Sequence, residues 1–221
     1  MSVLTTLGEL LARLADLLTP LFGASATAAA VVACTMGVRL ALHPLARAGI
    51  RGEKARAALA PRIAEIRRRH PDDPARQQRA LQRLHAETGT SPLAGCLPVL
   101  LQIPVFLVLF QLFTRPESGL LDEALLGTPL GSRWVHALSD GGPLGPHGLV
   151  FLALFAVIGA VATISWLRAR RAASPELTGP LRLLPLLSFG SLVTAAVVPL
   201  AAGLYLATTL AWTVTERALL A

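Results

Sequence analysis

Long apolar runs restrict the fold of this chain more than any other feature. A helix needs about 20 mostly apolar residues to cross the hydrocarbon core of a bilayer. Five segments of the 221-residue sequence meet that requirement, at 24–43, 93–113, 148–167, 181–198 and 202–219. Charged residues make up 15% of the chain, whereas an ordinary soluble domain has about a quarter. The sequence therefore predicts an all-α, polytopic membrane protein, with residues 1–221 forming one membrane-embedded core.

The last two predicted spans come from one apolar stretch that is too long for a single helix. Pro199 and Gly203 interrupt it. Proline cannot continue a helix and glycine tolerates a turn. We therefore expect a tight connection at this point, between the fourth and fifth spans.

The first residues predict a separate amphipathic helix over 3–19. Its leucines recur at helical spacing, and Glu9, Arg13 and Asp16 fall on the other side. The segment lacks the basic start of a cleavable signal peptide. Two interpretations remain open, a helix lying on the membrane surface and an ordinary packed helix.

The segment 45–92, between the first two spans, is strongly basic. It carries eleven Lys and Arg residues against five Asp and Glu residues. "HPDDPA" interrupts it, with Asp73 suited to an N-cap and Pro74 to the first helical position. "ETGTSP" ends it, with Gly89 suited to a C-cap. We expect a helical hairpin, with helices over about 46–69 and 74–88.

The charges of the connections predict the orientation, because basic residues favour the cytoplasmic side. The hairpin is basic, and so is the loop 168–180, since four Arg residues and one Glu lie between 168 and 182. The loop 114–147 has two basic and four acidic residues. These signs alternate as five spans require. The prediction is a plasma-membrane protein with its N-terminus outside, the loop 114–147 extracytoplasmic, and the hairpin and C-terminus inside.

Arg39 is the most unusual residue of the first span. A charge at membrane depth costs at least about 2.5–3.5 kcal/mol. Arg39 lies five residues before Pro44, so it is roughly 7–8 Å inside the cytoplasmic end of a helix. Either its side chain extends to the interface, or it faces the bundle interior and lines a wet cavity. The position alone favours neither.

Other polar residues in the spans are candidates for the same interior. Gln102 lies in the second span near two prolines, where it could line a cavity or bond a neighbouring helix. The hydroxyl residues are weaker candidates, because Ser and Thr often bond to their own helix. These candidates are Thr163, Ser165, Ser188 and Ser191.

The sequence contains no catalytic or metal-binding constellation. The spans contain no pair of carboxylates, the five histidines are scattered, and no G-x-S-x-G motif is present. Cys34 and Cys96 have neither disulfide nor metal-ligand spacing. We therefore expect a protein that is not an enzyme and that has no cofactor, no metal and no specific DNA binding.

These features resemble the YidC/Oxa/Alb family of membrane protein insertases. "VRLALHPL", the basic hairpin and "TGTSPLAGCLPVLLQIPVFLVLFQLF" are similar to the family's arginine-bearing span, its charged hairpin and its second-span signature. "VVPLAAGLYLATTLAWT" is similar to the fifth-span signature. The residues that carry the match as structural motif positions are Pro44, Gly89, Pro92, Gly95, Cys96, Pro98, Pro104 and Gly203.

The resemblance implies a mechanism. Arg39 would lie in a hydrophilic groove open to the cytoplasm and to lipid, with Gln102 and the Ser and Thr hydroxyls hydrating it. Nascent membrane proteins would be its clients, and the chain would work as a monomer, with the Sec translocon and the ribosome as further partners. The hairpin would receive the client or face headgroups or ribosomal RNA. Its candidate residues are Arg62, Arg67, Arg68, Arg69, Arg76 and Arg79.

Two other functions stay open from the sequence. One is a small transporter or channel subunit that binds an anionic solute at Arg39. The other is an accessory protein of the Sec channel without insertion activity.

Overall fold

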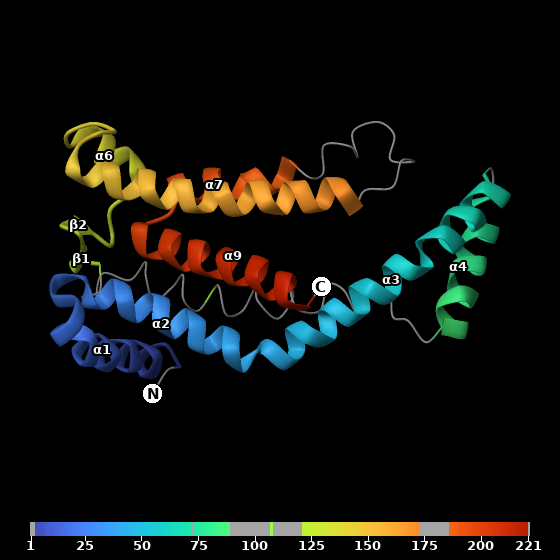
Figure 1. The fold of residues 1–221 in the computed structure, drawn as a ribbon, viewed down its shortest axis with the longest axis horizontal. Helices are drawn as coiled ribbons and strands as arrows, with labels where there is room; N and C mark the ends of the chain where they lie inside the picture. Colours follow the sequence, from blue (N-terminus) through green and yellow to red (C-terminus); the bar gives the residue numbers. More distant parts are fainter. Residues whose placement is uncertain (1–2, 72, 89–106, 108–120, 173–185, 221) are drawn as a thin grey trace. The chain divides into compact units, whose positions relative to one another are not determined.

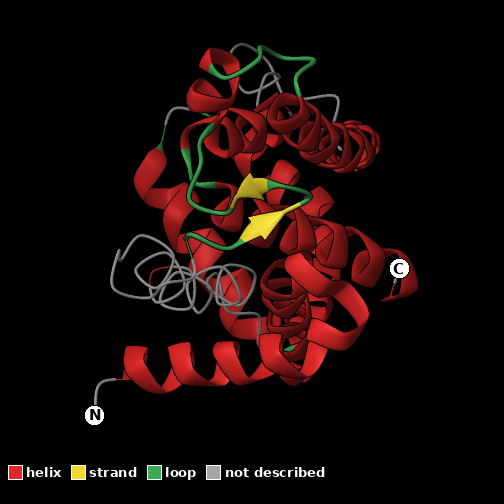
Figure 2. Cartoon of the chain, turned by 90° about the vertical axis from the view of Figure 1, so that its left-hand side faces the viewer, coloured by secondary structure: helices red, strands yellow, loops and turns green. Residues whose placement is uncertain are grey.

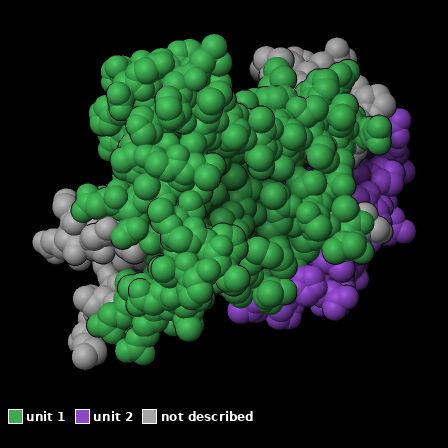
Figure 3. All heavy atoms as spheres, turned by 60° about the vertical axis from the view of Figure 1, so that its left-hand side comes forward, with its two compact units in different colours: residues 1–40, 106–219, 221 green, residues 41–105, 220 purple. Residues whose placement is uncertain are grey.

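The computed structural model describes residues 3–71, 73–88, 107, 121–172 and 186–220. Nearly all of these residues are helical, and their only sheet is a two-stranded one (Figure 2). The chain divides into two compact units (Figure 3). Unit 1 comprises residues 1–40, 106–219 and 221, and unit 2 comprises residues 41–105 and 220.

Unit 1 contains most of the apolar helices. They are α1 (Val3–Phe22), the 3-10 turn η1 (Gly23–Ser25), α2 (Ala26–Ala41), α7 (Pro146–Ala172), α8 (Gly190–Val197) and α9 (Leu200–Leu220) (Figure 1). Two described stretches are long and apolar enough to cross a membrane, Gly8–Ala41 and Pro146–Arg171. The apolar helix Leu186–Val197 is shorter. The predicted span 93–113 lies outside the described residues except for Leu107, which is helical.

The first of these stretches is not one straight helix. Gly23 has a φ of +54°, a left-handed conformation that glycine adopts without steric cost. After this turn α1 and α2 face each other, since Leu18 of α1 and Ala29 and Ala33 of α2 line the same apolar hollow. The chain therefore changes direction between the predicted surface helix and the predicted first span.

The break in the last apolar stretch differs in part from the sequence prediction. Val198 is extended and α9 begins at Leu200, so Pro199 does separate two helices. Gly203, however, lies inside α9. A Cβ at position 203 would come within 2.8 Å of Leu154 Cδ2 on α7. The prediction of a turn at Gly203 is wrong, and the missing side chain instead leaves room for the Leu154 side chain of α7.

The predicted loop 114–147 contains regular structure in its described part. Strands β1 (Ala124–Leu125) and β2 (Thr128–Pro129) pair antiparallel, and the short helix α6 (Trp134–Ser139) follows. Leu126 and Gly127 form the two-residue turn with φ values of 51° and 83°, as type I′ hairpins require. We call residues 121–145 the cap.

The cap holds the start of α9. The first N–H groups of a helix have no partner within the helix. The Leu200 N–H donates to Ser132 O at 2.9 Å, and the Ala201 N–H donates to Leu130 O at 3.0 Å. Leu130 is itself fully buried, with 0% exposure. The cap thus supplies acceptors that the helix start needs.

The same cap contacts the starts of α2 and α7. The Leu126 N–H donates to Ser25 Oγ at 3.3 Å, immediately before α2. Thr128 Oγ1 and His147 Nδ1, at the start of α7, lie 3.1 Å apart. Therefore α2, α7 and α9 all begin at the cap, and Figure 1 shows them running from it in the same direction.

An aromatic cluster joins α6 to α7. The Trp134 ring lies 5.2 Å from Phe155 in an edge-to-face arrangement and 5.9 Å from Phe151. Phe151 is fully buried. These contacts fix the short helix of the cap on the first turns of α7.

Unit 2 contains α3 (His43–Arg69) and α4 (Pro74–Thr88), which contact each other. Pro44 lies in the first turn of α3, where a missing N–H is tolerated. Asp73 Oδ1 accepts the Arg76 N–H at 2.9 Å. This confirms that Asp73 is the N-cap of α4 and that Pro74 is its first residue.

Candidate functional site

Four polar side chains lie on one side of α9. Tyr205, Thr209, Trp212 and Glu216 follow each other at steps of four, three and four residues, the spacing of neighbours on one helix face. Tyr205, Thr209 and Glu216 are only 4%, 9% and 7% exposed, and the Trp212 ring nitrogen is covered. We call these four residues the polar face of α9.

Arg39 of α2 interacts with this face. Its side chain is half-buried, one helical turn beyond the buried Thr35, whose hydroxyl donates to Val31 O at 2.7 Å. Tyr205 and Glu216 both act electrostatically on the Arg39 guanidinium. The Arg39 Nε atom is covered, so part of this side chain is buried within unit 1.

Three buried polar atoms at this site have no hydrogen-bond partner among the described residues. They are Arg39 Nε, Thr209 Oγ1 and Trp212 Nε1. Buried polar atoms in folded proteins almost always have a protein or water partner. One of these atoms belongs to α2 and two belong to α9, so both helices carry hydrogen-bonding groups that no described residue satisfies.

An apolar hollow of about 630 Å³ adjoins the polar face. Met36 of α2, Val157 of α7 and Leu204 of α9 are among its lining residues, and Trp212 belongs to both the hollow and the polar face. The site is thus amphipathic. It combines a surface for an apolar segment with a guanidinium that attracts anionic groups.

The predicted hydroxyl residues lie on α7 and in the turns at the start of α8. Thr163 is exposed and its hydroxyl donates to Gly159 O at 2.8 Å. The Ser191 hydroxyl donates to Ser188 O at 2.8 Å. Ser165 and Ser188 are half-buried. The described groups that act electrostatically on Arg39 are Tyr205 and Glu216 of α9.

Several predicted motif residues lie outside the described residues. These are Gln102, Gly89, Pro92, Gly95, Cys96, Pro98 and Pro104. Of the motif residues that are described, Pro44 lies in the first turn of α3 and Gly203 leaves room for Leu154 of α7.

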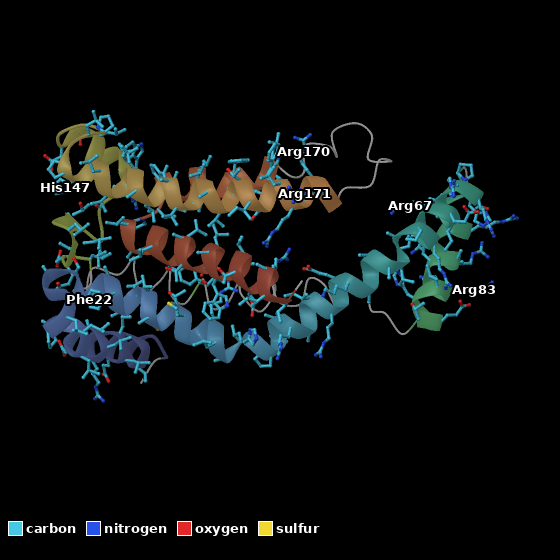
Figure 4. The ribbon with its side chains drawn as sticks, viewed as in Figure 1. Phe22, Arg67, Arg83, His147, Arg170 and Arg171 are labelled. Atoms are coloured by element: carbon cyan, nitrogen blue, oxygen red, sulfur yellow. The ribbon has the colours of Figure 1, made fainter. Side chains whose placement is uncertain are left out.

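The predicted receiving residues lie in unit 2, on α3 and α4. Arg62, Arg67, Arg68 and Arg69 lie on α3, whereas Arg76 and Arg79 lie on α4. Figure 4 shows Arg67 and Arg83, on the two helices. A hollow of about 400 Å³ between α3 and α4 is lined by His70 and by the α4 residues Arg76, Arg79 and Arg83.

Some of these arginines are already paired. Glu65 contacts Arg69 at 2.8 Å and Arg68 at 2.5 Å. The hydrogen bond from Arg69 and the charge of Arg68 lower the pKa of the Glu65 carboxyl. Arg76 pairs with Asp73 at 3.0 Å. The basic surface is therefore partly neutralised by its own acids.

Sequence reasoning missed the polar face of α9. Glu216 is a single carboxylate, not one of a pair, within the predicted fifth span. Its helical spacing from Tyr205, Thr209 and Trp212 is visible in the sequence and could have indicated one polar side. That this side meets Arg39 depends on how α2 and α9 pack.

The comparisons with known proteins agree with one another. The family model for the 60Kd inner membrane protein matches residues 17–221. The membrane protein insertase YidC of Aquifex aeolicus is 39% identical over 113 residues, covering 51% of this chain and 21% of its own length. The inner membrane ALBINO3-like protein 2, chloroplastic, of Chlamydomonas reinhardtii is 32% identical over 157 residues, covering 66% of this chain and 37% of its own length.

A solved structure has the same fold. It is described as an active YidC insertase crystal structure with the first transmembrane domain resolved. The TM-score is 0.63 at 22% identity, over 97% of this chain and 45% of that one. The chain thus spans less than half the length of these relatives. The family model covers nearly the whole chain, and the chain belongs to the 60Kd inner membrane protein family, which is the YidC/Oxa/Alb family of membrane proteins.

Proposed function

We propose that this protein inserts client membrane proteins through a hydrophilic groove that contains Arg39. The observation that carries the proposal is the position of Arg39, whose buried Nε lacks a described hydrogen-bond partner and whose guanidinium interacts with the polar face of α9. Family membership supports the same role. An intramembrane arginine that faces inward is typically functional.

The physical mechanism requires no catalysis. An acidic or polar tail of the client would be attracted to Arg39, so that it crosses less hydrocarbon on its way to the other side. The client's apolar segment would contact the adjoining hollow before it moves into lipid. Each step lowers the free-energy barrier to moving a polar group of the client across the membrane. Without such help, burying the polar group in hydrocarbon costs several kcal/mol.

The proposed topology has five spans, with the cap outside and the C-terminus in the cytoplasm. Two facts about unit 1 support this orientation. The helices α2, α7 and α9 all start at the cap, and basic residues lie near the other ends of α7 and α9; Figure 4 shows Arg170 and Arg171 at the end of α7. These are Arg168, Arg170, Arg171 and Arg217. Basic residues favour the cytoplasmic side.

The partners follow from this role and topology. We propose nascent membrane proteins and the lipid bilayer as partners, with the hairpin of α3 and α4 as the receiving surface. Its unneutralised arginines suit a client's acidic residues, anionic headgroups or ribosomal RNA. The Sec translocon is a further proposed partner, and the working unit is proposed to be one copy.

The experiment that tests the proposal is rescue of bacteria depleted of their own insertase. The chain is expressed in these cells, and membrane insertion of a short two-span client is followed by protease protection. Wild type is expected to restore insertion. Arg39→Ala is expected to slow it about tenfold, which corresponds to about 1.4 kcal/mol in the barrier. Arg39→Lys should keep part of the activity, because it keeps the charge.

Arg171→Ala is the matched control, because it removes an exposed arginine at the end of α7. It should insert the client like wild type. Equal activity of Arg39→Ala and Arg171→Ala, with both proteins present in the membrane, would reject the groove role of Arg39. No rescue by wild type at normal membrane levels would reject insertion of this client class.

A further inference from the structure

Glu216 is a carboxylate that the groove mechanism does not use. It lies in the last turns of α9 and is 7% exposed. Its neighbour Arg217 is exposed. The Glu216 side chain therefore lies on the buried side of α9 and the Arg217 side chain on the exposed side. A buried carboxylate is strongly unfavourable unless a cation or hydrogen-bond donors compensate it. Glu216 therefore needs an electrostatic reason to lie here.

Arg39 provides that reason. Met36 of α2 and Trp212 of α9 line the same hollow, and Arg39 and Glu216 each lie about one helical turn farther along their helices. The two side chains therefore lie at the same level of unit 1, where the Glu216 carboxylate acts electrostatically on the Arg39 guanidinium. The two opposite charges come from helices that are far apart in the sequence, and each reduces the cost of burying the other. An arginine has five N–H donors in a planar fork, and its Nε is still without a described partner. The guanidinium therefore keeps donors for a second anion.

We propose that Glu216 is the resting counter-ion of Arg39, and that an acidic group of a client competes with it for the guanidinium. This inference rests on the proposed insertase function and adds an internal competitor to it. In the resting protein, Glu216 neutralises the intramembrane arginine. During insertion, a client carboxylate enters the same field and Glu216 loses part of its interaction. Glu216 thereby sets how strongly the anionic tail of a client must bind Arg39 before the client is inserted.

The competition predicts a gain of function from a single substitution. Glu216→Gln keeps the size of the side chain and removes its charge. The measured quantity is the ratio of two insertion rates, that of a client with an acidic tail and that of the same client with Asp changed to Asn. Glu216→Gln should raise this ratio about five- to tenfold, which is the low end of coupling between two sites. Glu123→Gln is the control, because Glu123 is an exposed acid of the cap. It should leave this ratio unchanged.

The experiment uses the full chain in proteoliposomes, with the acidic and neutral clients inserted in parallel. The proposal is overturned if Glu216→Gln and Glu123→Gln give the same ratio. It is also overturned if Glu216→Gln raises the ratio equally in an Arg39→Ala background, because the effect must act through the arginine.

A second measurement separates this inference from the insertase function. Thermal unfolding of wild type, Arg39→Ala, Glu216→Gln and the double variant forms a double-mutant cycle. If the charges are partners, Arg39→Ala leaves a buried carboxylate uncompensated, and adding Glu216→Gln should restore part of the lost unfolding temperature. Additive losses would refute the pair even in an active insertase. Coupled losses without insertion of either client would keep the pair and refute the function.

Discussion

Truncation of Leu130 tests whether the cap stabilises the start of α9. Leu130 is 0% exposed, and its carbonyl accepts the Ala201 N–H. Leu130→Ala removes three carbon atoms. At about 0.8 kcal/mol for each buried CH2 this loses about 2.4 kcal/mol, and the cavity left behind raises the loss to about 3–5 kcal/mol. Local opening of the cap exposes the α9 amides. A loss of only about 2.4 kcal/mol should therefore speed their hydrogen exchange about 50-fold.

The assay is hydrogen exchange followed by mass spectrometry, with the protein in lipid nanodiscs and peptides that cover Leu200 and Ala201. Leu144→Ala is the matched control, since Leu144 is a cap residue with 77% exposure. Its effect should stay within about 0.5 kcal/mol. If Leu130→Ala changes exchange at the start of α9 no more than Leu144→Ala does, the cap does not stabilise that helix end.

Two further predictions concern backbone geometry in and beside the cap. Leu126 has a φ of 51°, which costs an ordinary residue about 1–2 kcal/mol. Leu126→Asn should therefore raise stability by about 1 kcal/mol in thermal unfolding, and an equal gain from Leu126→Ala would contradict the reason given. A Cβ on Gly148 would overlap the backbone oxygens of Gly142 and Pro143, whereas nothing lies within 4 Å of one on Gly159. Gly148→Ala should thus lower the unfolding temperature and Gly159→Ala should raise stability by about 0.5–1 kcal/mol; the same direction for both would refute the packing argument.

The parts of the fold that depend on local chemistry were predictable. Asp73 and Pro74 start α4 as their side chains require, because the N-cap hydrogen bond and the fixed φ of proline act within one helical turn. The apolar runs likewise indicated where α7 and α9 lie. In both cases the prediction depends only on residues that are close together in the sequence.

The remaining parts depend on contacts between distant segments. Gly203 was expected in a turn, whereas its role comes from Leu154, far away in the sequence. The strands of the cap have two residues each, which is too short for the alternation that indicates a strand. Arg39 could be identified as unusual from the sequence, but its proposed pairing with Glu216 depends on the arrangement of α2 and α9 around one hollow.

The attachment of α9 at one end has a mechanical consequence. The hydrogen bonds to the cap hold its first two residues, and Glu216 lies about 24 Å farther along the helix at 1.5 Å per residue. A tilt of only about 5° around that attachment moves Glu216 by about 2 Å, while the residues at the cap hardly move. Small rotations that leave the start of α9 attached to the cap are therefore amplified at the level of Arg39, where they change the separation between Arg39 and Glu216.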